Sequence, residues 1–187
     1  MIKTKKDLRY YIKEDGKRNG CYPYLNYLIN SILGLENAWA FRYIRCMRKC
    51  EFHLNNSNKS LFHKFTYWCY YVKLSRLGRK YMIQITPNTC GYGLRLIHLT
   101  GGGILLNVNK VGNYCGFNCG VVLGNKDAQE NRPIIGDHVA FGPGAKAFGS
   151  VTIGSNVFVA PNAVVTKDIP DNCIVGGIPA KVIKNKE

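Results

Sequence analysis

Residues 135–170 repeat with a period of six residues. Divided into hexads, they read IGDHVA, FGPGAK, AFGSVT, IGSNVF, VAPNAV and VTKDIP. Six consecutive hexads in phase indicate a solenoid, because the strands of a β-sandwich would follow a period of two. The first position is always apolar: Ile135, Phe141, Ala147, Ile153, Val159 and Val165. The fifth is apolar and mostly small: Val139, Ala145, Val151, Val157, Ala163 and Ile169.

A triangular coil gives this period a physical basis. Three short strands, each followed by a tight turn, form one coil of three hexads. The first residue of each hexad points into the prism, the fifth lies near a corner, and glycine and asparagine supply the turn conformations. Coils stack at the strand spacing of roughly 4.8 Å. One coil cannot bury its own apolar face, so stacking and end caps are needed. We therefore predict a left-handed parallel β-helix.

The same period continues towards the N-terminus. A second run of apolar first positions precedes the six hexads, and residues 125–133 separate the two runs. This separating segment is predicted to be a loop that projects from a corner of a coil. The second run consists of Leu99, Leu105, Val111, Phe117 and Leu123.

The composition divides the chain near residue 80. Residues 1–80 contain 17 Lys and Arg against 5 Asp and Glu, whereas residues 81–187 contain 9 against 6. Fifteen of the 22 aromatic residues lie before residue 81, and 16 of the 20 glycines follow residue 80. We therefore expect a mainly β protein with two parts: a basic, aromatic-rich helical unit over residues 1–80, and a β-helix domain with a C-terminal tail over residues 81–187.

Three helices are expected in the first 80 residues. Thr4 and Asp7 have the spacing of a capping box in front of a short helix over residues 8–14. A second helix begins near Asn37, and a third covers residues 61–77, because apolar residues recur there at intervals of three or four.

The basic and aromatic surface of this unit has three interpretations. It can be the solvated Lys/Arg face of a packed cap. It can attract an anionic membrane surface, or a lipid-linked or acidic sugar. Nucleic acid is the least favoured partner, because no recognisable nucleic-acid motif accompanies the charge.

The eight cysteines are scattered through apolar segments, and the opening residues MIKTKKD do not resemble a secretory signal. Reduced thiols in the cytoplasm are therefore expected. No run of 18 uninterrupted apolar residues predicts a transmembrane helix. Because the N-terminal unit is basic, a protein bound peripherally to the inner face of the membrane is the alternative to a freely cytoplasmic one.

Three motifs resemble those of a known family. Residues 93–104 read GLRLIHLTGGGI, residues 120–124 read GVVLG, and residues 165–172 and 175–183 read VTKDIPDN and VGGIPAKVI. They resemble the hexapeptide-repeat acyltransferases, and in particular the serine acetyltransferase-like branch found in bacterial capsule and exopolysaccharide clusters. The resemblance implies transfer of an acetyl group from acetyl-CoA to a hydroxyl, in a homotrimer with each active site between neighbouring prisms.

The resemblance makes His98 the general base. An attacking alcohol must lose its proton, and imidazole is the usual acceptor. The tetrahedral oxyanion needs donors, commonly backbone N–H groups, and the adjacent Gly101–Gly103 run allows close approach. The alternative is a histidine that faces solvent or is hydrogen-bonded at a corner of a coil.

Two positions depart from the family pattern and are expected to bind or orient the acceptor. Gln84 aligns, after a one-residue gap, with the aspartate that orients the histidine in serine acetyltransferases of the cysteine pathway. Arg132 takes the place of their second histidine, before Pro133. Arginine suits an anionic acceptor better than it suits base catalysis. These changes favour a sugar of a polysaccharide precursor over free serine, although both acceptors remain open.

The resemblance also implies a CoA site along the groove between neighbouring β-helices. Lysines there would act as point charges towards the CoA phosphates. The alternatives are solvated lysines and ordinary turn glycines. The implied residues are Gly142, Pro143, Pro161, Thr166, Lys167, Lys181 and Lys184.

Two rival functions are considered. One is a non-enzymatic scaffold that docks through its basic helices. The other is a metalloenzyme of the γ-carbonic anhydrase type, which needs three converging histidines. Only His98 and His138 lie in the predicted β-helix, and His138 is interpreted as an outward turn residue. We therefore expect an acetyl-CoA-dependent O-acetyltransferase without a metal.

Overall fold

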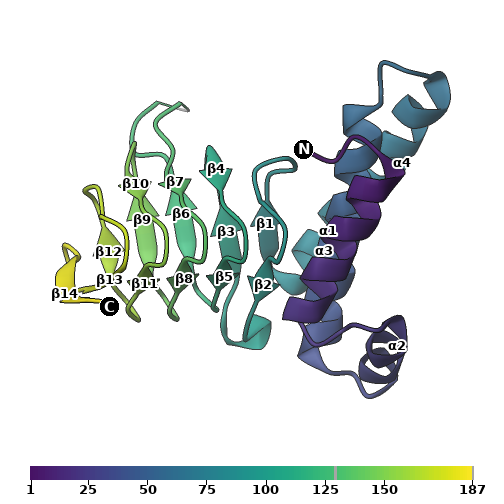
Figure 1. The fold of residues 1–187 in the computed structure, drawn as a ribbon. Helices are drawn as coiled ribbons and strands as arrows, with labels where there is room; N and C mark the ends of the chain where they lie inside the picture. The colour runs from purple at the N-terminus through teal and green to yellow at the C-terminus, as the bar shows by residue number, and fades with distance from the viewer. Residues whose placement is uncertain (129, 187) are drawn as a thin grey trace.

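A computed structural model describes residues 1–128 and 130–186. Four helices are followed by a β-helix, and Figure 1 shows the helices covering the end at which the chain enters the β-helix. The helices are α1 (Lys5–Arg18), α2 (Tyr24–Ile32), α3 (Glu36–Asn55) and α4 (Leu61–Tyr81). No helix in the described ranges is long and apolar enough to cross a membrane.

Three sheets form the faces of a prism, and every strand pair is parallel except β13–β14. Sheet A contains β1 (Ile83–Ile85), β3 (Ile104–Leu106), β6 (Val122–Gly124), β9 (Lys146–Phe148) and β12 (Val164–Val165). Sheet B contains β4 (Lys110–Val111), β7 (Ile134–Ile135) and β10 (Thr152–Ile153). Sheet C contains β2 (Arg95–Leu96), β5 (Gly116–Phe117), β8 (Ala140–Phe141), β11 (Phe158–Val159), β13 (Cys173–Gly176) and β14 (Lys181–Asn185). The predicted left-handed parallel β-helix is confirmed.

The apolar first and fifth residues of the hexads form the core of the prism. The six residues predicted to point inward and the six fifth-position residues predicted near the corners of the 135–170 stretch are all buried. The rings of Phe117 and Phe141, from neighbouring coils, stack with centroids 5.4 Å apart. The predicted loop lies between β6 and β7.

The register predicted at Leu105 is wrong. Ile104 and Leu106 are each 1% exposed, whereas Leu105 is half-buried and faces outward. Leu106 and Val111 are the buried residues of successive strands, and they are five residues apart. This spacing is one residue short of a hexad, so the period of six shifts by one at this turn.

The helices are longer and more numerous than predicted. The capping box of Thr4 and Asp7 is confirmed, but α1 extends to Arg18. α3 begins at Glu36, one residue before the predicted start at Asn37. α2 was not expected, and none of its residues is buried. α4 continues through Gly78 to Tyr81, and Gly78 is required for packing instead of ending the helix, because a Cβ there would lie 2.6 Å from the carbonyl oxygen of Ile83.

A buried ionic cluster joins the helices to the first coil. Arg48 of α3 is fully buried and contacts Asp15 at 2.8 Å and Glu51 at 3.1 Å. Its guanidinium also donates to the carbonyl oxygens of Cys90 and Gly91, at 2.9 and 2.5 Å. Burial raises the pKa of Asp15, against the attraction of the Arg48 guanidinium. The cluster therefore fixes α1 and α3 on the end of the prism.

Candidate active site

One corner of the prism carries His98 and much of the predicted CoA site. At this corner, which we call the C–A corner, the chain leaves sheet C and enters sheet A. His98, Cys119, Pro143 and Pro161 take matching positions in successive coils, each two residues after a buried residue of sheet C. The N–H of Gly144 donates to the Cys119 carbonyl at 2.8 Å. With coils roughly 4.8 Å apart, His98 and Pro161 lie about 14 Å apart.

His98 occupies a left-handed turn at the head of this column. Its φ is 56°, and its side chain is exposed and makes no hydrogen bond within the described part of the chain. The next residue begins a short 3-10 helix, Leu99–Gly101. The Glu36 carboxylate, at the start of α3, accepts from the N–H of Leu99 and lies 3.5 Å from the Thr100 hydroxyl. A helix from the N-terminal unit therefore holds the turn that presents His98.

The three glycines after this turn are packed tightly against the chain itself. A Cβ at Gly103 would lie 2.7 Å from the Met82 carbonyl oxygen, and one at Gly101 would lie 3.2 Å from Sγ of Cys119. The N–H groups of Gly101 and Gly102 donate to the carbonyls of His98 and Leu99. The N–H of Gly103 makes no hydrogen bond with any described residue. It is therefore available to a ligand.

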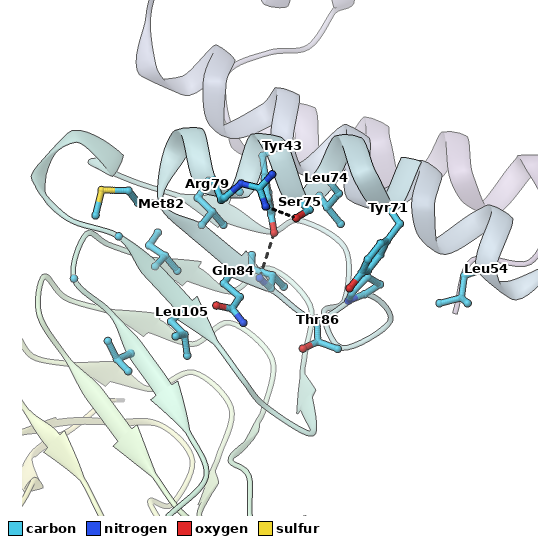
Figure 2. A pocket seen from close by; sticks show the side chains of 18 of the residues that line it. Tyr43, Leu54, Tyr71, Leu74, Ser75, Arg79, Met82, Gln84, Thr86 and Leu105 are labelled. Carbon is cyan, nitrogen blue, oxygen red and sulfur yellow. Dashed lines mark hydrogen bonds between the residues drawn. The ribbon is translucent and has the colours of Figure 1, made fainter. Parts of the chain in front are cut away.

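A cavity of about 1020 Å³ lies between α4 and the outer face of sheet A. Gly103 and Gly120 line the part next to the C–A corner. Figure 2 shows Gln84, Thr86 and Tyr71 around this cavity, with Arg79 and Ser75 above them on α4. Gln84 is exposed on β1, opposite the outward-facing Leu105 of β3. No hydrogen bond joins Gln84 to His98 within the described residues.

The remaining predicted residues are divided between two corners. Gly142 belongs to the C–A corner, where a Cβ would lie 2.7 Å from the nitrogen of Pro161, so packing within the chain already requires this glycine. Lys181 is exposed and pairs with Gly176, where sheet C meets the same corner, whereas exposed Lys184 lies further along β14.

Three residues lie on the other side of sheet A. Thr166 and Lys167 directly follow β12, at the corner where the chain passes to sheet B. The projecting loop leaves β6 at the corresponding corner, and Arg132, half-buried, lies at its far end before β7. The side chain of Asn109 donates to the Arg132 carbonyl at 3.3 Å and fixes this end of the loop. These three residues do not share the corner that carries His98.

His138 is an outward turn residue, as predicted. Its φ is 56°, its side chain is exposed, and its ring stacks on Tyr114 with centroids 5.2 Å apart. It lies where the chain passes from sheet B to sheet C, on a different corner from His98. No cluster of three His, Cys, Asp or Glu side chains suited to a metal occurs in residues 1–128 and 130–186.

Sequence reasoning missed two residues of this site. Glu36 is 63 residues from Leu99 in the chain, and no local pattern predicts their contact. Cys119 could have been found, because it takes the hexad position that Pro143 and Pro161 occupy in the following coils.

Comparisons with known proteins agree with this fold. No protein-family profile matches the chain. A serine acetyltransferase of Synechococcus elongatus is 34% identical over 133 residues, which is 65% of this chain and 54% of that protein. One of Staphylococcus xylosus is 35% identical over 105 residues, 54% of this chain and 48% of that protein. The chain thus spans about half the length of these curated relatives.

Solved structures extend the likeness to the helices. Soybean serine acetyltransferase superposes with a TM-score of 0.72 at 25% identity, covering 94% of this chain and 69% of that one. A serine acetyltransferase in complex with CoA gives a TM-score of 0.71 at 20% identity, covering 96% and 71%. The chain therefore has the fold of the serine acetyltransferases, and it is similar to the two named relatives in sequence over 65% and 54% of its length.

Proposed function

We propose that the protein is an acetyl-CoA-dependent O-acetyltransferase in which His98 is the general base. The observation that carries this proposal is the C–A corner, where an exposed imidazole without a partner in the described chain heads a column of turns. One structural relative was solved with CoA, which supports acetyl-CoA as the donor.

In the proposed reaction, Nε2 or Nδ1 of His98 takes the proton of the acceptor hydroxyl as its oxygen attacks the thioester carbonyl. The unused N–H of Gly103 is the proposed donor to the resulting oxyanion. The intermediate then expels CoA, whose sulfur takes the proton back from His98, and the acetyl ester remains on the acceptor. Lys181 and Lys184 are proposed to face the CoA phosphates, with Gly142, Pro143 and Pro161 along its path. Thr166 and Lys167 lie on the other side of sheet A from the C–A corner, so they would contact only a CoA molecule that extends across this sheet.

The cavity favours a sugar acceptor over serine. Its volume of about 1020 Å³ is at the upper end of the range for drug-sized ligands, whereas serine is far smaller. Tyr71 offers an aromatic face, and Gln84, Thr86 and Arg79 offer hydrogen-bonding groups. We propose the hydroxyl of a polysaccharide-precursor sugar, with Gln84 binding it in the cavity. Arg132 is proposed to bind the acceptor from the neighbouring prism of a homotrimer, because within one chain it lies on a different corner from His98.

The test is CoA release from acetyl-CoA with L-serine, aminosugars and acidic sugars as acceptors. Wild type is compared with His98→Asn and with the matched control His138→Asn. Asparagine is chosen because both histidines have a φ of 56°, which asparagine tolerates. We expect His98→Asn to lower kcat on the order of 100-fold to 10,000-fold, and His138→Asn to leave it unchanged.

The possible outcomes separate the candidate functions. Turnover with sugars and not with serine supports the sugar acceptor, whereas turnover with serine makes the protein a serine acetyltransferase despite Gln84 and Arg132. Equal activity of His98→Asn and wild type would remove His98 from the mechanism. A folded protein that does not bind CoA would overturn acetyl transfer and favour a non-enzymatic scaffold.

A further inference from the structure

The outward face of α4 is apolar over its first three turns and has no partner in the described residues. Leu61, Phe65, Trp68 and Val72 recur at intervals of three or four residues, so they share one face of the helix. Their exposed fractions are 84%, 70%, 54% and 46%, and Phe62 beside them is 68% exposed. A helix that is apolar on both faces is normally covered on both. An exposed apolar patch of this kind marks an interaction surface.

The outward face becomes basic in the second half of the helix. Lys73, Arg76 and Lys80 are exposed and continue the apolar stripe or lie directly beside it. Lys64 lies on the other flank, near Trp68. α4 contains no Asp or Glu. We call the surface made of these four cations and the five apolar residues above the α4 face. No acidic side chain of α4 compensates its positive charge.

Carboxylates elsewhere in the helical unit do not pair with this charge either, because none of the five in residues 1–80 forms a salt bridge with a cation of α4 among the described residues. Of the 17 Lys and Arg in this segment, Lys17 and Arg48 alone form salt bridges among the described residues. Asp7 accepts from the N–H groups of Lys3 and Thr4, Glu14 pairs with Lys17, Asp15 and Glu51 pair with Arg48, and Glu36 binds the N–H of Leu99.

We propose that the α4 face docks on an anionic membrane surface. Trp, Phe and Leu side chains on one helix face insert at the boundary between headgroups and acyl chains, and neighbouring Lys and Arg bind lipid phosphates. A bilayer with anionic lipids offers both chemistries. A second copy of the same face would instead bring unpaired cations towards one another, and like-charge contacts oppose association.

Docking in this way would place the cavity next to the membrane. Tyr71 and Leu74 lie on a different flank of α4 from the docking stripe and line the cavity, whereas Arg79, which also lines it, is seven residues after Val72 and continues the stripe (Figure 2). One helix, about 10 Å in diameter, would then separate the cavity from the lipid surface. Docking is independent of the acetyl transfer proposed above, since it involves neither His98 nor the C–A corner.

The first test is flotation of the full chain with phosphatidylcholine vesicles, with and without phosphatidylglycerol. We expect flotation only with phosphatidylglycerol, and less of it as salt is added. The Trp39→Phe variant leaves Trp68 as the single tryptophan, because the chain has two. Its emission should shift to shorter wavelength when anionic vesicles are added.

Paired variants assign the binding to the α4 face. Phe65→Ser with Trp68→Ser should abolish flotation, and Lys73→Gln with Arg76→Gln should weaken binding roughly fivefold for each charge removed. Matched controls on other exposed helices are Leu25→Ser with Ile32→Ser on α2, and Lys5→Gln with Lys6→Gln on α1. Circular dichroism melts verify that each variant is folded.

Three results would overturn the proposal. The first is no flotation with anionic vesicles. The second is an equal loss of binding in the α1 or α2 controls. The third is a concentration-dependent assembly that the Phe65 and Trp68 changes abolish in the absence of lipid, which would assign the face to a second copy of the chain.

Discussion

The carboxylate of Glu36 accepts a hydrogen bond from the backbone N–H of Leu99, the residue that follows His98. Glu36 is the first residue of α3, and Leu99 lies between the first and second coils. The corner that presents His98 is therefore held by a side chain from a different part of the fold.

Glu36→Ala should lower kcat by on the order of 100-fold at most, because a freed turn misplaces His98. KM for acetyl-CoA should be nearly unchanged. Glu36→Gln separates charge from hydrogen bonding, since the amide oxygen can still accept from Leu99. Recovery of activity in Glu36→Gln identifies a positioning residue. A shifted pH profile in Glu36→Gln would instead show that the negative charge acts on His98.

Cys119 should react with alkylating reagents, and CoA should protect it. Cys119 is half-buried on the C–A corner and Cys69 is exposed on α4, whereas the other six cysteines are buried. Burial raises the pKa of Cys50 and Cys90 to about 12 and that of Cys115 to about 11, which suppresses their reactive thiolates. Mass spectrometry after brief alkylation should find label on Cys119 and Cys69. If CoA slows both equally, or neither, the C–A corner is not its path.

Arg48→Met should destabilise the fold by about 3–5 kcal/mol, because it leaves Asp15 and Glu51 buried without their counter-charge. A chain of this size should then melt about 10 °C lower. Arg42→Met, an exposed change on the same helix, is the control. The triple variant Arg48→Met, Asp15→Asn, Glu51→Gln should regain part of the loss. A wild-type melting temperature for Arg48→Met would show that the cluster does not hold the helices.

Stability should fall as the pH decreases from about 7 towards 5. Nδ1 of His53 and Nδ1 of His63 lie 3.0 Å apart between α3 and α4, so one must be unprotonated to accept. Burial, together with His63 and Lys49, lowers the pKa of His53. The unfolded chain therefore binds this proton more readily, and stability is lost as the pH falls through the ordinary histidine pKa of about 6.5 towards the lowered folded value.

Thermal melts across this pH range test the histidine pair. His53→Gln should flatten the dependence, whereas His138→Asn, on an exposed turn, should not change it. An unchanged slope in His53→Gln would assign the loss of stability to other groups.

The β-helix could be predicted because its period is a local property of the sequence. Each hexad has its own inward residue, such as Phe141 or Ile153, so six agreeing hexads determine the fold. The failure at Leu105 has a physical reason: one turn lacks a residue, and a strict period carried across that turn places the wrong side chain inside. α2 is amphipathic, with Leu25, Leu28, Ile29 and Ile32 at helical intervals, but it is only nine residues long and no side-chain cap marks its start.

The site could be predicted only in part, because the period of six gives the position of a residue on its coil but not the packing of the helices on the coils. His98, Pro143 and Pro161 align because residues at one hexad position share a corner. The contact of Glu36 with Leu99 and the cavity under α4 depend on how the helices pack on the first coil, and no period records that packing.

The stack of coils also has a consequence for evolution. His98 belongs to the first coil, and Lys181 to the strand that closes the last one, on the same corner. Inserting or deleting one whole coil would preserve the hydrogen-bonding register of every strand pair. It would change the distance between His98 and Lys181 by one step of roughly 4.8 Å. The number of coils therefore determines the distance between His98 and Lys181. Selection can change the distance between His98 and the C-terminal strand in fixed increments, while every turn keeps its sequence.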